Sequence, residues 1–292
     1  MNKSMLLFLA IIIGFVFPQI HVLSFIIKYL LMIMLFSAFL SIEINKSLLN
    51  IKLPILFISN ILFAFVAYYC ISYFHRELAL IVFISIIGPS ATASPAIISL
   101  LKGNLQFITA QVLLSNILTA LTLPYFISLI YSSSQTADTF PMIRDILIII
   151  LAPFIVAQII KNTMHHLHTF IIRSRLVAFD SLVLVICIAV SQSSFYIRSQ
   201  QNIPISYLVI IAFTVLSTTI LCWALGRAIG GKKYALEAGQ GLGNKNTVLM
   251  TWFALNFINP LVALGPVLYL VFDSSYNSYQ LYKAGTIKKK KK

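Results

Sequence analysis

The sequence predicts an all-α polytopic membrane protein with ten transmembrane helices, and three observations support this fold class. Of the 292 residues, 60% are hydrophobic and only 10% are charged, whereas soluble domains carry about 25% charged residues. Apolar stretches close to the roughly 20 residues that cross a bilayer recur along the whole chain. Two of them are interrupted by polar segments rich in glycine and proline, "GPSATASP" at 88–95 and "EAGQGLGNKN" at 237–246.

The connections between the apolar stretches are short, so we expect one integral membrane unit without a soluble domain. The first span is expected to be retained, because no small-residue cleavage site follows it. In chain order, the predicted spans cover residues 5–20, 24–43, 53–73, 77–101, 105–131, 143–160, 175–195, 205–229, 233–258 and 260–281.

Basic residues are distributed unequally between the two sides of these spans. Segments on the side of the N-terminus hold 16 Lys and Arg residues, and segments on the other side hold 4. The positive-inside rule therefore places both termini in the cytoplasm. The net charge of +14 comes from these loops and from the basic tail at 282–292. It predicts contact with anionic lipid head groups rather than with nucleic acid.

The two interruptions suggest an internal symmetry. When the chain is divided at the polar loop 132–140, the parts 1–131 and 143–281 each contain five spans, with the interruption in the fourth. An odd number of spans gives the two parts opposite orientations, which makes them inverted repeats. Interrupted hydrophobic segments at matching positions of two halves indicate the binding site of a transporter.

The first interruption offers hydroxyl groups. Ser90, Thr92 and Ser94 lie between two prolines, where they can bind freed backbone groups or face a ligand. The simpler interpretation is a proline kink whose hydroxyls cap the adjoining half-helices. On the fifth span, Thr109 and Asn116 can form interhelical hydrogen bonds or contact a ligand.

The second interruption offers charge. Glu237 and Lys245 are ionisable groups inside a predicted span, and such groups are functional-site candidates because burying them is expensive. They can form a structural ion pair, or a pair that protonation of Glu237 opens if the unwound segment doubles back. Nearby amides that can bind an ion or an anion are those of Gln240, Asn244 and Asn246.

These segments resemble the bile acid:sodium symporter superfamily over nearly the whole chain. The resemblance is carried by "LLMIMLFSAFLSIEINKSLLN" at 30–50, "GPSATASPAIISLLKGN" at 88–104 and "EAGQGLGNKNTVLMTWFALNFINPLVALGPVLYLV" at 237–271. It implies that broken helices 4 and 9 cross at the centre, and that a core of crossing helices works against a panel domain. In sodium-coupled members, sodium binds behind the crossing, and the resemblance implies Ser94 and Glu237 as its ligands.

Departures from the family pattern indicate a different coupling. Pro95 replaces an asparagine ligand, and the hydroxyl ligands of the fifth span fall near Ile108 and Val112. The second crossover is about three residues longer, and the glutamine of the third span has no clear match, although Asn60 is near. The ammonium of Lys245 can take the place of a bound cation.

The sequence therefore predicts a secondary active transporter of a small organic anion that works by alternating access in the bacterial cytoplasmic (inner) membrane. Coupling would be to H⁺, or independent of sodium with Lys245 in place of a cation. The alternatives are a sodium-coupled symporter of bile-acid-like or carboxylate substrates and, in another class, an ion channel. No HExxH, GxGD or serine motif with a base is present, so an enzyme is not expected.

Overall fold

The protein is helical and apolar over the part of the chain that the structure describes. The structure, a computed structural model, describes residues 3–40, 50–131, 139–164, 171, 176–199 and 203–290. Within these residues, six helical segments are long and apolar enough to cross a membrane. The predicted all-α membrane class is thus confirmed, and the division into ten spans and two inverted repeats stays a prediction.

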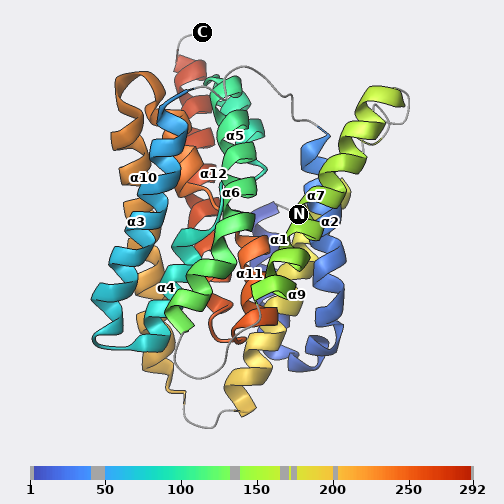
Figure 1. The fold of residues 1–292 in the computed structure, drawn as a ribbon, viewed down its shortest axis with the longest axis vertical. Helices are drawn as coiled ribbons and strands as arrows, with labels where there is room; N and C mark the ends of the chain where they lie inside the picture. Colours follow the sequence, from blue (N-terminus) through green and yellow to red (C-terminus); the bar gives the residue numbers. More distant parts are fainter. Residues whose placement is uncertain are drawn as a thin grey trace.

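The helices follow the predicted spans closely (Figure 1). Near the N-terminus, the first helix stops at Val16 because Pro18 disfavours helical backbone at the residue before it and begins a 3₁₀ helix. In chain order, the elements are α1 (Lys3–Val16), η1 (Pro18–Ile26), α2 (Ile27–Phe39), α3 (Lys52–Ser72), α4 (Arg76–Ile87), α5 (Ser94–Leu100), α6 (Leu105–Tyr131), α7 (Thr139–Thr163), α9 (Leu176–Ser199), α10 (Ile205–Gly243), α11 (Thr247–Phe257) and α12 (Leu264–Lys290).

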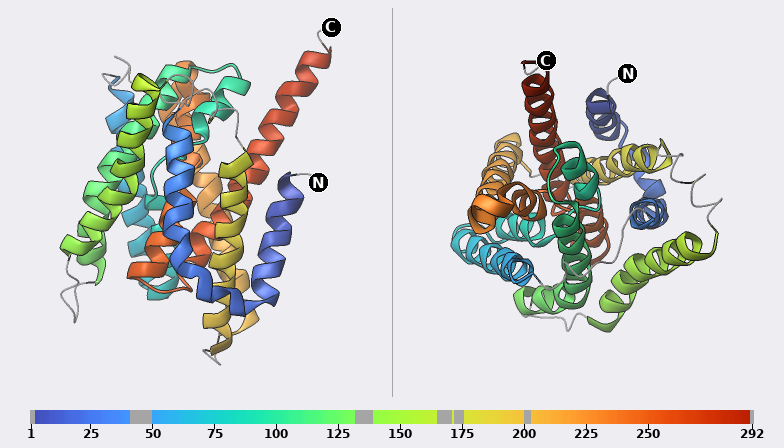
Figure 2. Two further views of the ribbon diagram at one scale, coloured as in Figure 1. Left: turned by 90° about the vertical axis from the view of Figure 1, so that its right-hand side faces the viewer. Right: turned by 90° about the horizontal axis from the view of Figure 1, so that it is seen from above.

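The helices pack as two groups. One group contains α1, η1, α2, α7 and α9, and the other contains α3, α4, α5, α6, α10, α11 and α12. The right-hand view of Figure 2 shows the two groups side by side. They meet where α6 contacts α7 and where α9 contacts α11 and α12.

Both predicted interruptions exist, but the second is shorter than predicted. The first covers residues 88–93 between α4 and α5, and the second covers only 244–246 between α10 and α11. Gly239, Gly241 and Gly243 are helical, so the prediction that they unwind is wrong. They allow close packing instead, because a Cβ on Gly243 would lie 2.3 Å from the Trp223 ring and one on Gly241 would lie 2.8 Å from Cγ of Gln111.

The predicted gap between the eighth and ninth spans is a kink inside α10. Gly231 has φ 60° and ψ −162°, a backbone conformation that glycine adopts without strain. The ammonium of Lys52 donates to the carbonyls of Ile229 (2.9 Å) and Gly230 (2.6 Å). These contacts satisfy carbonyl groups that lose their helical partners at the kink.

Two predicted boundaries fall in or near parts of the chain that the structure does not fully describe. Residues 132–138, most of the loop between the proposed repeats, lie outside the described residues. At the other boundary, α12 continues to Lys290, so the predicted tail at 282–292 is largely an extension of that helix.

Candidate functional site

The two interruptions pair with each other. Ser90 and Lys245 form an antiparallel β-bridge. On either side of it, the N–H of Ala91 donates to the carbonyl of Asn244, and the N–H of Asn246 donates to the carbonyl of Pro89, both at 2.8 Å. Backbone groups freed at membrane depth must be satisfied inside the protein. Here each interruption provides partners for the other, so the two broken helices meet as predicted.

Helix α6 supports the first interruption from the side. Ser90 donates its N–H to the hydroxyl of Ser115 (3.1 Å), and its carbonyl accepts from the amide of Asn116 (3.0 Å). The hydroxyl of Ser90 donates to the carbonyl of Gly241 at 2.5 Å. Asn246 donates to the side-chain oxygen of Asn116 at 3.3 Å. Three predicted site residues, Ser90, Asn116 and Asn246, are therefore brought together.

Lys245 is buried at the centre of this crossing, with only 3% of its surface exposed. Its ammonium donates to the side-chain oxygen of Asn60 on α3 at 2.5 Å. The amide of Asn60 in turn donates to the carbonyls of Ile87 (3.3 Å) and Gly88 (3.4 Å) at the end of α4. A helix C-terminus carries partial negative charge, so this position favours a cation. Asn60 is thus a functional candidate that the sequence indicated only weakly.

Glu237 lies away from Lys245, and the predicted proximity of the two groups is wrong. Within the described residues they form no ion pair. Glu237 instead accepts the N–H of Asn104 at 2.5 Å, where the connection after α5 leads into α6. Because α10 stays helical to Gly243, the axial rise from Glu237 to the end of that helix is about 9 Å. The carboxylate therefore faces a different part of the protein.

A chain of amides leads from the second interruption to a buried acid on α12. Asn244 donates to Gln240 (3.0 Å), Gln240 donates to Asn277 (2.6 Å), and Asn277 donates to the carboxylate of Asp273 (3.1 Å). Asp273 is only 2% exposed, and among the described residues it forms no direct ion pair. Its position inside the predicted span 260–281 was an available signal, because an ionisable residue at membrane depth is a functional candidate.

Three predicted site residues remain, and they lie on or near α5 and on α6. Thr92 is partly buried within it, and Thr109 is buried on α6. The hydroxyl of Ser94, at the start of α5, is buried and has no hydrogen-bond partner among the described residues.

A sodium site behind the crossing does not fit these residues well. Sodium requires several oxygen ligands, and Ile108 and Val112 are fully buried side chains without oxygen. One carboxylate oxygen of Glu237 already accepts the N–H of Asn104. Two buried oxygen atoms without hydrogen-bond partners among the described residues, the hydroxyl of Ser94 and Oε1 of Gln111, are the features that favour an ion.

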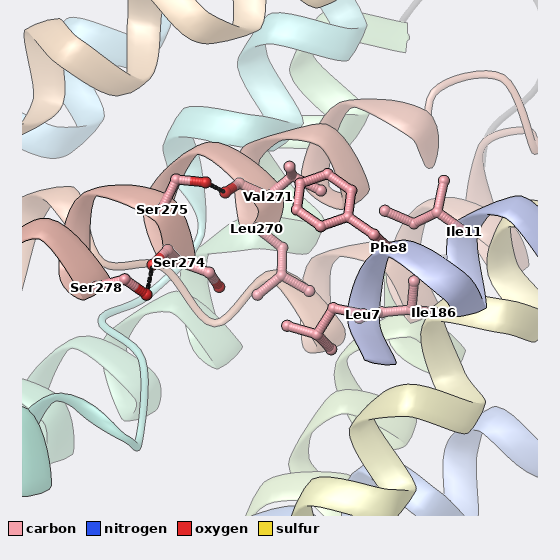
Figure 3. A pocket seen from close by; sticks show the side chains of 9 residues that line it. All are labelled: Leu7, Phe8, Ile11, Ile186, Leu270, Val271, Ser274, Ser275 and Ser278. Carbon is pink, nitrogen blue, oxygen red and sulfur yellow. Dashed lines mark hydrogen bonds between the residues drawn. The ribbon is translucent and has the colours of Figure 1, made fainter. Parts of the chain in front are cut away.

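A cavity of about 200 Å³ lies at the boundary between the two helix groups (Figure 3). Ser275 and Ser278 donate their hydroxyls to the carbonyls of Val271 (2.7 Å) and Ser274 (2.8 Å) in their own helix. The cavity is thus apolar on its α1 and α9 sides and weakly polar on its α12 side. Its walls are formed by Leu7, Phe8, Ile11, Ile186, Leu270, Val271, Ser274, Ser275 and Ser278.

Together, the composition, the apolar helices and the paired interruptions define a polytopic helical membrane protein. Comparison with protein families and with curated proteins finds no match for this chain. Its function is therefore inferred from the geometry of the crossing.

Proposed function

We propose that the protein is a secondary active transporter that moves a small organic anion by alternating access, with Lys245 in place of a bound cation. The observation that carries this proposal is the buried ammonium of Lys245 at the junction of two helix interruptions. Interrupted helices of transporters place their ends at the substrate and ion site. A fixed positive charge at such a junction favours an anionic substrate.

The proposed architecture is ten transmembrane helices in two inverted repeats, 1–131 and 143–281, in the bacterial cytoplasmic membrane with both termini in the cytoplasm. The antiparallel pairing of the interruptions supports this arrangement, because inverted halves present matching segments in opposite directions. The two packed groups of helices support alternating access. The resemblance to the bile acid:sodium symporter superfamily points the same way.

A proton, rather than sodium, is the proposed coupling ion. The ammonium of Lys245 occupies a position at a half-helix C-terminus that would otherwise suit a free cation. Asn60 joins this ammonium to the carbonyl end of α4. An ammonium held covalently at this place makes a second cation unfavourable through like-charge repulsion. The sodium-coupled alternative is favoured by the buried oxygens of Ser94 and Gln111, which have no hydrogen-bond partner among the described residues.

The proposal is tested first by finding the substrate and then by measuring transport. Purified protein is screened by thermal shift against organic anions at two pH values, with and without sodium. The anion that stabilises it most is then used in uptake into liposomes with imposed pH or sodium gradients. We expect saturable uptake that follows the pH gradient and continues without sodium.

Other outcomes separate the alternatives. Uptake that requires sodium and ignores pH would reject the role of Lys245 as a cation substitute and leave the transporter proposal intact. Flux that does not saturate would indicate a channel instead.

A further inference from the structure

We propose that Asp273 is the carboxylate that exchanges a proton with the transport pathway and that its charge balances that of Lys245 across a chain of amides. This assignment rests on the proposed transport function and replaces Glu237 in the coupling role. Asp273 lies on α12, and no side chain of the two interruptions contacts its carboxylate directly. Other side chains must therefore connect this carboxylate to the crossing.

The amide chain provides that connection. Asn277 holds the carboxylate of Asp273 from one turn further along α12. Gln240 and Asn244 continue the chain to the residue that precedes Lys245. Gln240 and Asn277 each use both the oxygen and the nitrogen of their side-chain amide in this chain, and Asn244 uses its nitrogen. A change at Asp273 therefore alters the hydrogen bonding of the second interruption.

The other polar groups around Asp273 are less suited to the role. Cys222 and Trp223 face it from α10, and Tyr269 faces it from the preceding turn of α12. The hydroxyl of Tyr269 is committed to the carbonyl of Gly243 at 2.7 Å. Lys245 and Asp273 are both buried, and among the described residues they form no direct ion pair. The amide chain connects the carboxylate to the segment that holds the ammonium.

The cost of burial links the charges of these two groups. A single uncompensated charge at membrane depth is expensive, whereas a carboxylate and an ammonium together carry no net charge. When the carboxylate of Asp273 takes up one proton from the side to which the crossing is open, Lys245 loses its compensating charge. An anionic substrate restores the balance. Release of the substrate and of that proton on the opposite side re-forms the original pair.

A stoichiometry follows from this charge balance. One proton enters with each negative charge that compensates Lys245. Symport of a monovalent anion with one proton is therefore electroneutral and insensitive to membrane potential.

Glu237 is the natural comparison, because it is also an almost fully buried carboxylate in a predicted span. Its oxygen accepts the backbone N–H of Asn104 at 2.5 Å, and it lies beside Gly103. This carboxylate has a fixed structural partner, and among the described residues no chain of side-chain amides joins it to the segment of Lys245. Its contacts suit a role in holding the connection between α5 and α6 against α10.

The test uses the proton as its probe and requires no substrate. Infrared spectra of the purified protein are recorded across a pH titration to detect the carbonyl band of a protonated carboxylic acid. We expect a titrating band in the wild type and in Glu237→Gln, and its loss in Asp273→Asn. In Lys245→Met the midpoint of that band should move. No titrating band in the wild type, or a band that survives Asp273→Asn, overturns the assignment.

A double-mutant cycle provides the second measurement. Melting temperatures are compared for Asp273→Asn, Lys245→Met and the double variant. The loss in the double variant should be smaller than the sum of the single losses, because the two removed charges compensate each other. Additive losses overturn the pairing.

Asp273→Asn is expected to fold, since its amide oxygen still accepts from Asn277. If this variant does not fold, the titration midpoint of the infrared band in Lys245→Met is the deciding measurement. A midpoint equal to that of the wild type overturns the proposal. Failure of uptake in liposomes would reject the transport function without changing either of these measurements, so the two failures are distinguishable.

Discussion

The two interruptions of this protein differ in where their stabilising groups come from. The first, at 88–93, is held from outside, by the hydroxyl of Ser115 and the amide of Asn116 on α6. The second, at 244–246, brings its own polar side chains, which reach outward to α3 and α6. The first thus presents backbone to its neighbours, and the second presents charge.

This difference separates two tasks that broken helices must fulfil. Freed backbone groups need partners, and small hydroxyl and amide groups on a neighbouring helix meet that need. A functional site also needs a group that responds to ions or ligands, and only the second interruption contains one. Substitutions at the two interruptions should therefore have different consequences.

The largest effect is expected for Lys245→Met. It removes the ammonium that donates to Asn60 and leaves that side-chain oxygen buried without its donor. Leaving a buried polar group without its charged partner costs about 3 kcal/mol, so we expect a strongly lowered melting temperature and loss of anion uptake. Lys232→Met, at an exposed position of α10, is the matched control and should behave as the wild type. A stable, active Lys245→Met protein would show that the second interruption does not depend on its charge.

A smaller effect is expected for Gly243→Ala, which tests the close packing that keeps the second interruption short. The added Cβ would lie 2.3 Å from the ring of Trp223, and overpacking of this kind costs about 2 kcal/mol. In the control, Gly239→Ala, the nearest atom belongs to the flexible side chain of Arg227 at 2.8 Å. Thermal unfolding in detergent should therefore show a clear loss for the first variant and a slight one for the second. Equal losses would contradict the packing explanation.

Ser115→Ala tests the support of the first interruption. It leaves the N–H of Ser90 without its partner, which should lower the free energy of unfolding by about 1 kcal/mol. Ser128→Ala is the control on the same helix, because that hydroxyl bonds only the carbonyl of Pro124 in its own helix among the described residues. Unfolding in denaturant measures the free energy of unfolding of both variants. If the two variants lose the same stability, the hydroxyl of Ser115 does not support the interruption.

The smallest effect is expected for Glu237→Gln. The amide oxygen still accepts from the N–H of Asn104, so the melting temperature should change by an amount equivalent to less than about 0.5 kcal/mol. Glu237→Leu removes this acceptor and should be clearly less stable. A large loss in Glu237→Gln would mean that the negative charge itself is required at this position.

The sequence predicted the places of the interruptions well and their contents less well. Proline and glycine marked the first interruption to within two residues, because Pro95 lies in the first turn of α5, where proline is tolerated. The glycines of 237–246 suggested unwinding, yet they remain helical because Trp223 and Gln111 occupy the space that side chains would fill. A glycine is recognisable in the sequence, but whether it unwinds a helix or admits a neighbour depends on what packs there.

The site residues also differ in how well the sequence predicted them. Lys245, Ser90, Asn116 and Asn246 were predicted and lie together, since polar groups in interrupted membrane segments gather where those segments meet. Sequence proximity suggested that Glu237 pairs with Lys245, whereas in the structure Glu237 accepts the N–H of Asn104. The buried acid that the chain of amides joins to Asn244 is Asp273 on α12.

The sequence by itself determined that the chain is a helical membrane protein interrupted at two points, because hydropathy and backbone preference are properties of local composition. The tertiary structure alone decided that Lys245 meets Asn60, 185 positions away, and that Glu237 faces Asn104. Such contacts depend on the rotation and axial position of whole helices, and these are set by packing between distant segments.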